Sequence, residues 1–248
     1  MSGHSKWSTI RHRKGAQDAK RGKIFTKVIK EITIAARDGG GDAAANPRLR
    51  RALDLARSQN VPADNIQRAI KRGTGELEGI SYEELTYEGV AGGGVLFVVQ
   101  SLTDNRNRTA PELRKIFDKH AGQLSTSGSA LWAFDERGII DLAEASVSEE
   151  RLFELAASAG AEDITQEGDH FRVLTPKEAF DAVSEAIEAA GVEVAEARLG
   201  WVPKTVKLMG DDEGRRLLAL LEALENHDDV QAVFSEFEPD DSLLHDEP

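Results

Sequence analysis

The sequence predicts an α+β multidomain protein, in which an N-terminal three-helix bundle is followed by two ferredoxin-like α+β domains, one inserted in the other. Two observations carry this prediction. The spacing of apolar residues changes from a helical to a strand period after about residue 80. Residues 138–202 then follow the pattern β-α-β-β-α-β, the order of the split βαβ unit, and the flanking segments supply the two halves of a second domain.

The first predicted element is a helix over residues 21–37, which follows a segment without a sustained apolar period. Its apolar residues recur at the helical spacing of about 3.6 residues and share one face. They are Ile24, Phe25, Val28, Ile29, Ile32 and Ala36. Three consecutive glycines, Gly39 to Gly41, are expected to end the helix, because glycine readily adopts the left-handed conformation that follows many helices.

Two shorter helices complete the predicted bundle. Pro47 and Pro62 each suit the first turn of a helix, where a missing N–H group costs nothing. The segments that follow from them are PRLRRALDLARSQN and PADNIQRAIKRG. The next segment, GTGELEGIS, combines glycines with acidic residues and is typical of a hinge.

The middle of the chain predicts strands in ELTYEGV and GVLFVVQSLT, joined through glycines. A helix is predicted to begin at Thr109, because Glu112 lies three residues on and the pair matches a capping box. SALWAF is then predicted to be a strand.

Residues 138–202 predict a strand in GIIDL, a helix in EERLFELAASAG, a hairpin from DITQEG to HFRVLT that turns at Gly168-Asp169, a helix in PKEAFDAVSEAIEAAG and a strand in VEVAEARL. A strand in PKTVKLM, a helix in DEGRRLLALLEALEN and a strand in VQAVFSEFE follow. The predicted domains are therefore residues 1–80, a discontinuous α+β domain of residues 81–137 and 203–248, and an inserted α+β domain of residues 138–202.

The composition is that of a globular cytoplasmic protein. Of the 248 residues, 40% are hydrophobic and 30% are charged, which excludes wholesale disorder. No apolar run is long enough for a membrane span, and the basic N-terminus lacks the apolar region of a signal peptide. The absence of cysteine agrees with a reducing compartment and excludes thiolate chemistry.

Charge is distributed very unevenly along the chain. Residues 1–72 contain 17 Lys/Arg against 6 Asp/Glu, a net charge of +11, and the remainder contains 14 against 38, a net charge of −24. The basic end would attract polyanions, while the acidic part would repel them and suit basic protein partners. The sequence thus predicts one nucleic-acid-binding module.

The candidate nucleic-acid-binding residues form a basic stripe on the first helix together with the preceding tail. They are Lys6, Trp7, Arg11, Arg13, Lys14, Lys20, Arg21, Lys23, Lys27 and Lys30. Like charges four residues apart weaken a helix, so phosphate partners explain the stripe better than a solvated helix flank does. Trp7 could stack on an unpaired base or pack onto the bundle.

Arg106 and Arg108, expected in a loop before a helix, offer a secondary phosphate contact, with a charged turn as the alternative. The histidines lack the spacing of metal ligands. The glycines of GVAGGGV do not match a nucleotide-binding loop. We therefore expect no metal, no cofactor and no catalytic residues.

Several motifs in order resemble the YebC/PmpR family: GHSKW, AQDAKRGKIFTK, GGGDAAANPRLR, the stretch ending in GTGEL, TYEG, LTDNRNRT and TSGS. The resemblance covers nearly the whole chain. It implies a three-domain cytoplasmic protein without cofactor or catalytic site, in a family described as DNA-binding transcriptional regulators, some of which act in translation at the ribosome.

Two functions follow as expectations. One is a regulator of transcription that binds DNA, although a lysine-rich stripe positions nucleic acid without specifying its sequence. The alternative is a ribosome-associated translation factor that binds structured RNA, either rRNA or tRNA. A scaffold whose basic end binds an acidic protein is a minor third interpretation. No membrane partner is expected.

Overall fold

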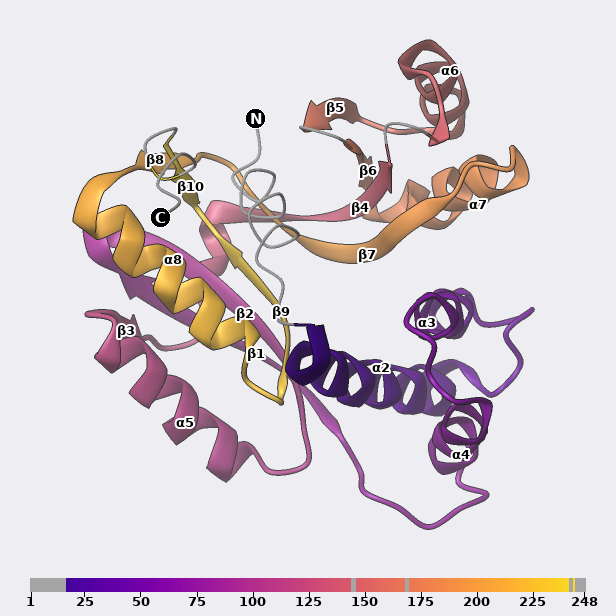
Figure 1. The fold of residues 1–248 in the computed structure, drawn as a ribbon, viewed down its shortest axis with the longest axis horizontal. Helices are drawn as coiled ribbons and strands as arrows, with labels where there is room; N and C mark the ends of the chain where they lie inside the picture. Colours follow the sequence, from indigo (N-terminus) through magenta and orange to yellow (C-terminus); the bar gives the residue numbers. More distant parts are fainter. Residues whose placement is uncertain (1–16, 144–145, 168–169, 241–242, 244–248) are drawn as a thin grey trace. The chain divides into compact units, whose positions relative to one another are not determined.

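The computed structural model describes residues 17–143, 146–167, 170–240 and 243, in which helices are combined with several mainly antiparallel sheets (Figure 1). The α-helices are α2 (Gln17–Gly39), α3 (Pro47–Ser58), α4 (Ala63–Gly73), α5 (Arg106–Lys119), α6 (Glu149–Ala159), α7 (Phe180–Ala189) and α8 (Asp211–Glu225). The strands are β1 (Glu83–Ala91), β2 (Val95–Thr103), β3 (Gln123–Leu124), β4 (Phe134–Ala143), β5 (Asp163–Glu167), β6 (His170–Pro176), β7 (Val194–Pro203), β8 (Lys207–Met209), β9 (Val230–Ser235) and β10 (Phe237–Pro239). Within this described part, residues 17–129 with 215–233 form one compact unit, and residues 130–214 with 234–240 form another.

Helices α3 and α4 both pack against α2, and the apolar face predicted for α2 is confirmed. Val28, Ile32 and Ala36 are buried there, and the other predicted residues of that face pack against the same cluster. α3 begins as expected with Pro47 in its first turn, after Asn46, whose side chain accepts a hydrogen bond from the backbone N–H of Leu49 at 3.1 Å.

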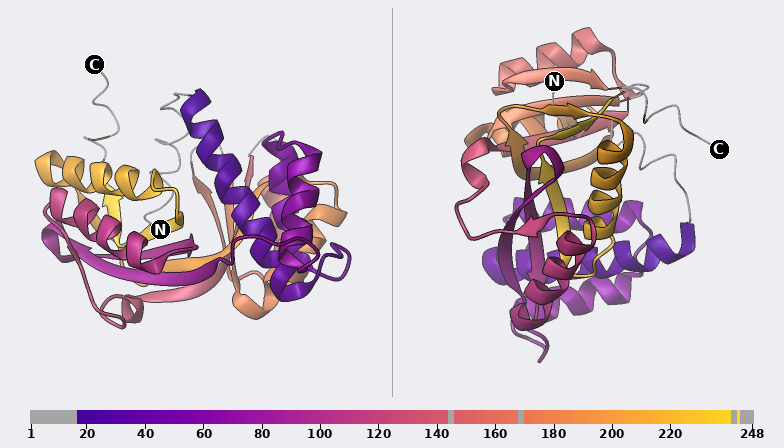
Figure 2. Two further views of the ribbon diagram at one scale, coloured as in Figure 1. Left: turned by 90° about the horizontal axis from the view of Figure 1, so that it is seen from below. Right: turned by 90° about the vertical axis from the view of Figure 1, so that its left-hand side faces the viewer.

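The first four-stranded sheet has the order β3-β1-β2-β9, with β1 and β2 antiparallel. Two views show α5 and α8 side by side over one of its faces (Figures 1 and 2). Phe117 of α5 meets Phe97 of β2 edge to face, with the ring centroids 5.8 Å apart. Gly89 of β1 lies directly beneath Phe117, where a Cβ atom would come within 2.5 Å of the ring. The helix therefore sits close to the sheet.

Two predicted boundaries in this region were wrong. α5 begins at Arg106 and not at Thr109, because the side chain of Asn105 accepts a hydrogen bond from the N–H of Arg108 at 3.2 Å and caps the helix one turn earlier. The predicted strand SALWAF is a short 3₁₀ turn followed by the start of β4. β4 then continues through Gly138, whose missing side chain leaves room for the side chains of Thr175 and Phe180.

The other unit contains β4-α6-β5-β6-α7-β7, the order of elements that the sequence predicted. Its sheet has the order β5-β6-β4-β7, and these neighbouring strands pair antiparallel. Buried side chains of the sheet, such as Ile140 and Val173, share a core with Leu152 of α6 and Ile187 of α7. The predicted turn at residues 168–169 lies outside the described residues. β8 and β10 form a separate parallel pair.

Among the helices that the structure describes, none is long and apolar enough to cross a membrane.

Candidate nucleic-acid interface

The predicted binding residues fall into three groups in the structure. One group lies outside the described residues: Lys6, Trp7, Arg11, Arg13 and Lys14. Lys20 and Arg21 belong to α2, but their side chains are outside the described part as well. The last group bonds to the end of α8 or to the loop that follows it: Lys23, Lys27, Lys30 and Arg108. Arg106 lies two residues before Arg108, in the first turn of α5.

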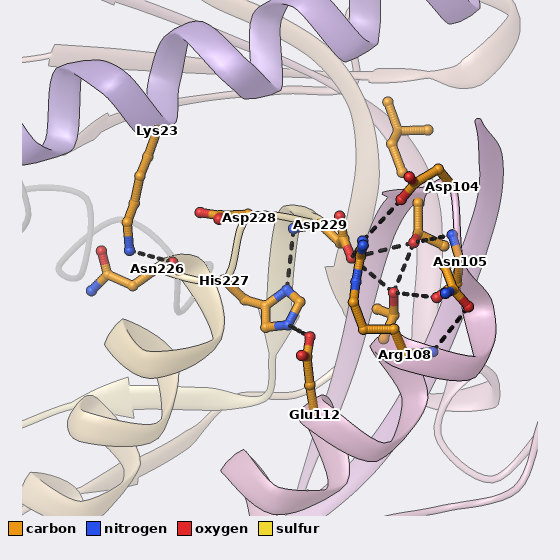
Figure 3. A network of polar contacts seen from close by, with 12 residues as sticks. Lys23, Asp104, Asn105, Arg108, Glu112, Asn226, His227, Asp228 and Asp229 are labelled. Carbon is orange, nitrogen blue, oxygen red and sulfur yellow. Dashed lines mark hydrogen bonds and ion pairs between the residues drawn. The ribbon is translucent and has the colours of Figure 1, made fainter. Parts of the chain in front are cut away.

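Lys23 and Lys27 cap the C-terminal end of α8. The ammonium group of Lys23 donates to the backbone carbonyl of Asn226 at 2.7 Å (Figure 3), and that of Lys27 donates to the carbonyl of Glu225 at 2.7 Å. The last carbonyls of a helix have no intrahelical partner and carry the negative end of its dipole. Cations from α2 therefore satisfy acceptors that α8 cannot satisfy itself.

Lys30 is buried, with 6% of its surface exposed. Its ammonium group donates to the carboxylate of Asp229 at 2.6 Å, to the backbone carbonyl of Asp228 at 2.9 Å and to that of Leu102 at 3.2 Å. A lysine ammonium has three N–H donors, so all of them have partners within the protein. The same group lies 5.7 Å from the centroid of the Tyr82 ring.

The carboxylate of Asp229 joins the two predicted basic groups. One oxygen accepts from Lys30. The other accepts from Arg108 at 2.7 Å (Figure 3) and from the Thr109 hydroxyl at 2.8 Å. Burial alone would raise the pKa of Asp229, but the hydrogen bonds from these three residues outweigh it and hold the pKa well below its ordinary value. The hydrogen bond that Arg108 donates to Asp229 raises the pKa of Arg108 in turn.

Arg108 also pairs with Asp104 at 2.9 Å, and 43% of its side chain is exposed. Arg106, in the first turn of α5, is exposed. Arg108 therefore shares Asp229 with Lys30 of α2 and is already paired with two carboxylates.

His227 extends this network towards α5. Its Nδ1 accepts from the backbone N–H of Asp229 at 3.1 Å, and its Nε2 lies 3.0 Å from a carboxylate oxygen of Glu112 (Figure 3). Glu112, His227 and Asp229 lie close enough together to hold a metal ion. The chemistry of these three groups does not favour a bound metal ion. The Nδ1 atom of His227 already accepts a hydrogen bond, which leaves the ring proton on Nε2. Both oxygens of Asp229 bond to cations.

Sequence reasoning missed Asp229, the centre of this network. Nothing in its spacing distinguishes it from the many other acidic residues of the C-terminal part, and its partners are brought to it by α2 and α5. Its position between the last turn of a helix and a strand was the only local signal.

Arg48 of α3 is also held within the protein. It pairs with Glu31 at 2.6 Å and with Glu84. Burial alone would lower the pKa of Arg48, but the hydrogen bonds to Glu31 and Glu84 raise it above its ordinary value. Other cations of α3 and α4 lie on exposed faces: Arg57, Arg68, Lys71 and Arg72. Residues 47–73 contain seven Lys/Arg against two Asp/Glu.

Two family models together match most of the chain. The model described as "TACO1/YebC protein N-terminal domain" matches residues 5–76, and "TACO1/YebC second and third domain" matches residues 82–237.

Similar proteins carry the name "probable transcriptional regulatory protein". The one from Desulforapulum autotrophicum is 51% identical over 235 residues, which is 95% of either chain. The one from Thermotoga maritima is 52% identical over 246 residues, covering 98% of this chain and 96% of the relative. The crystal structure of a conserved hypothetical protein from Aquifex aeolicus superposes with a TM-score of 0.87 at 44% identity, covering 94% of this chain and 96% of that one.

Proposed function

The chain belongs to the TACO1/YebC family, and from that premise we propose that it is a non-enzymatic cytoplasmic regulator of gene expression that binds DNA through its basic N-terminal part. One observation carries the proposal: a net charge of +11 in residues 1–72 against −24 in the rest of the chain. The acidic part repels polyanions, so binding is confined to the basic end. The names of the relatives support a role in regulation.

Within the basic end, we assign the first contacts to the tail and the start of α2: Lys6, Trp7, Arg11, Arg13, Lys14, Lys20 and Arg21. Lys23 and Lys27 are half-buried, and each gives one of its three N–H donors to a carbonyl at the end of α8, so part of their capacity to bind phosphate is already used. Lys30 is buried, so it affects binding of nucleic acid only by holding α2 in position. Arg106 and Arg108 remain the proposed secondary phosphate contact.

The alternative function, a ribosome-associated translation factor, is favoured by the position of α2. A helix that reads the major groove must present side chains to base edges. α2 uses one face for the helical core and directs lysines of another towards α8 and Asp229. Recognition through phosphates and shape, as for structured RNA, needs no such helix.

We also propose the domain division predicted from the sequence: residues 1–80, residues 81–137 with 203–248, and an inserted ferredoxin-like domain of residues 138–202. The antiparallel order β5-β6-β4-β7 with two intervening helices supports the description of the last of these.

Crosslinking in cells, followed by sequencing of the recovered nucleic acid, tests the function. The intact protein is compared with a variant in which Arg11, Arg13 and Lys14 are replaced by Gln. The matched control replaces three exposed cations of α5: Arg114, Lys115 and Lys119.

Promoter DNA recovered with the intact protein and the control, and lost with the tail variant, is the expected result. Ribosomal or transfer RNA at discrete positions would replace the transcriptional proposal with the translational one. Recovery of no nucleic acid at all would refute both.

A further inference from the structure

A hollow of about 260 Å³ opens between the loop that joins α2 to α3 and one side of α3. It is lined by Ala43, Ala44, Arg50, Leu53, Asp54 and Arg57. The apolar part is contributed by Leu53, which is 9% exposed, and by the two alanines. Arg50 and Arg57 are two turns apart on one helix face. The hollow therefore combines an apolar surface with two guanidinium groups.

The loop side of the hollow is held in place by its own hydrogen bonds. The carboxylate of Asp42 accepts from the backbone N–H of Ala44 at 2.9 Å. The side-chain amide of Asn46 donates to the carbonyls of Gly40 at 2.9 Å and Ala35 at 2.8 Å. Because these bonds connect the loop to the end of α2, the hollow exists before any ligand binds.

The arginine at the rim can change partner at little cost. Arg57 pairs with Asp54 at 2.6 Å, but 70% and 52% of the two side chains are exposed. An exposed ion pair is worth about 0–1 kcal/mol, so a phosphate can replace Asp54 as the acceptor and offers the geometry that a guanidinium prefers. Arg48, on the same helix, is held by Glu31 and Glu84 and lacks this freedom.

We propose that this hollow binds one unpaired base of a single-stranded nucleic acid, with the adjoining phosphate on Arg57. Its volume lies just below the roughly 300–1,000 Å³ of pockets for drug-sized ligands, which suits a base better than a whole nucleotide cofactor. Leu53 contacts the base, and the guanidinium plane of an arginine stacks on the base. Bases inside a duplex are already stacked, so the hollow selects single strands. This inference rests on the proposed nucleic-acid binding and names a site for it.

Fluorescence anisotropy of the full-length protein tests the site, with a fluorescein-labelled oligouridylate and a DNA duplex of equal length as probes. The test variant is Arg50→Gln/Arg57→Gln. The control variant is Arg114→Gln/Lys115→Gln, which removes the same charge from exposed positions on α5. Circular dichroism establishes that each variant is folded.

We expect the test variant to bind oligouridylate roughly tenfold more weakly, as when a stacked base loses its platform. The slope of log K against log salt should fall by about 0.7 for each phosphate that the variant no longer neutralises. The control variant should bind oligouridylate as tightly as the intact protein does. The affinity for the DNA duplex should change equally in both variants.

Equal losses of oligouridylate affinity in the test and control variants would mean that only overall charge matters, and would overturn the site while leaving the proposed function standing. Failure of the intact protein to bind either probe would remove the proposed function and this inference together.

Discussion

Replacing Lys30 with Met removes the buried ammonium group and keeps most of the aliphatic side chain. Lys30 and Asp229 have side-chain exposures of only 8% and 3%, with their charged atoms 2.6 Å apart. Removing one partner of a buried pair typically costs about 3–5 kcal/mol, because the remaining charge stays buried. Asp229 keeps Arg108 and Thr109, so we expect the free energy of unfolding to fall by an amount near the lower end, about 3 kcal/mol.

The loss of stability should depend on pH in a defined direction. The pKa of Asp229 is lowered in the folded protein, so its stabilisation is complete above the ordinary Asp pKa of about 3.9 and is lost as the pH falls towards the lowered value. The carboxylate of the Lys30→Met variant is protonated more easily. The difference between the two proteins should therefore be full at neutral pH and shrink in acid.

Amide hydrogen exchange in α2 and α8 of the full chain, with urea as the perturbant, measures this loss. Lys23→Met is the matched control, since Lys23 is half-buried and donates to a single carbonyl, and it should cost less than about 1 kcal/mol. Combining Lys30→Met with Asp229→Asn should cost less than the sum of the single changes. Surface substitutions usually change the free energy of unfolding by no more than about 0.5 kcal/mol. If the free energy of unfolding of the Lys30→Met variant lies within that range of the parent's, the assignment of a buried pair is refuted.

Three further substitutions test the packing, each by its urea unfolding midpoint. Asn46→Ala removes a helix cap and two bonds to carbonyls, and should cost about 1–3 kcal/mol; an unchanged midpoint would contradict the cap. Gly89→Ala places a Cβ atom 2.5 Å from the ring of Phe117 and should cost about 1–3 kcal/mol. Gly22→Ala, inside α2, should instead stabilise by up to about 1 kcal/mol, because within the described residues no atom beyond the helix's own backbone and the chain neighbours lies within 4 Å of the new Cβ; a lower midpoint there would contradict this.

The position of Lys30 also affects how charge reversal on α2 is interpreted. Replacing Lys23, Lys27 and Lys30 together with Glu leaves the apolar face intact, but it places a second carboxylate beside the buried Asp229. Weaker nucleic-acid binding by such a variant would report a displaced α2 as readily as a missing phosphate ligand. Substitutions in the tail and on α3 avoid this ambiguity.

Local patterns predicted much of the fold because they depend on neighbouring residues. The apolar spacing of α2 identified its buried face, and Pro47 placed the first turn of α3. Where tertiary packing competes with a local signal, prediction failed. SALWAF and GIIDL were predicted as two strands, yet β4 runs without a break from Phe134 to Ala143, and the missing side chain of Gly138 makes room for Phe180 in its middle.

The sequence by itself determined the order of most helices and strands, the buried face of α2 and the separation of a basic end from an acidic remainder. Tertiary structure decided what the lysines of α2 bond to. Lys30 and Asp229 are 199 positions apart, and a charged side chain carries no local sign of a partner that folding brings to it. The same pattern of lysines fits a phosphate-binding stripe or a set of internal hydrogen bonds, and only the positions of α8 and β9 distinguish the two.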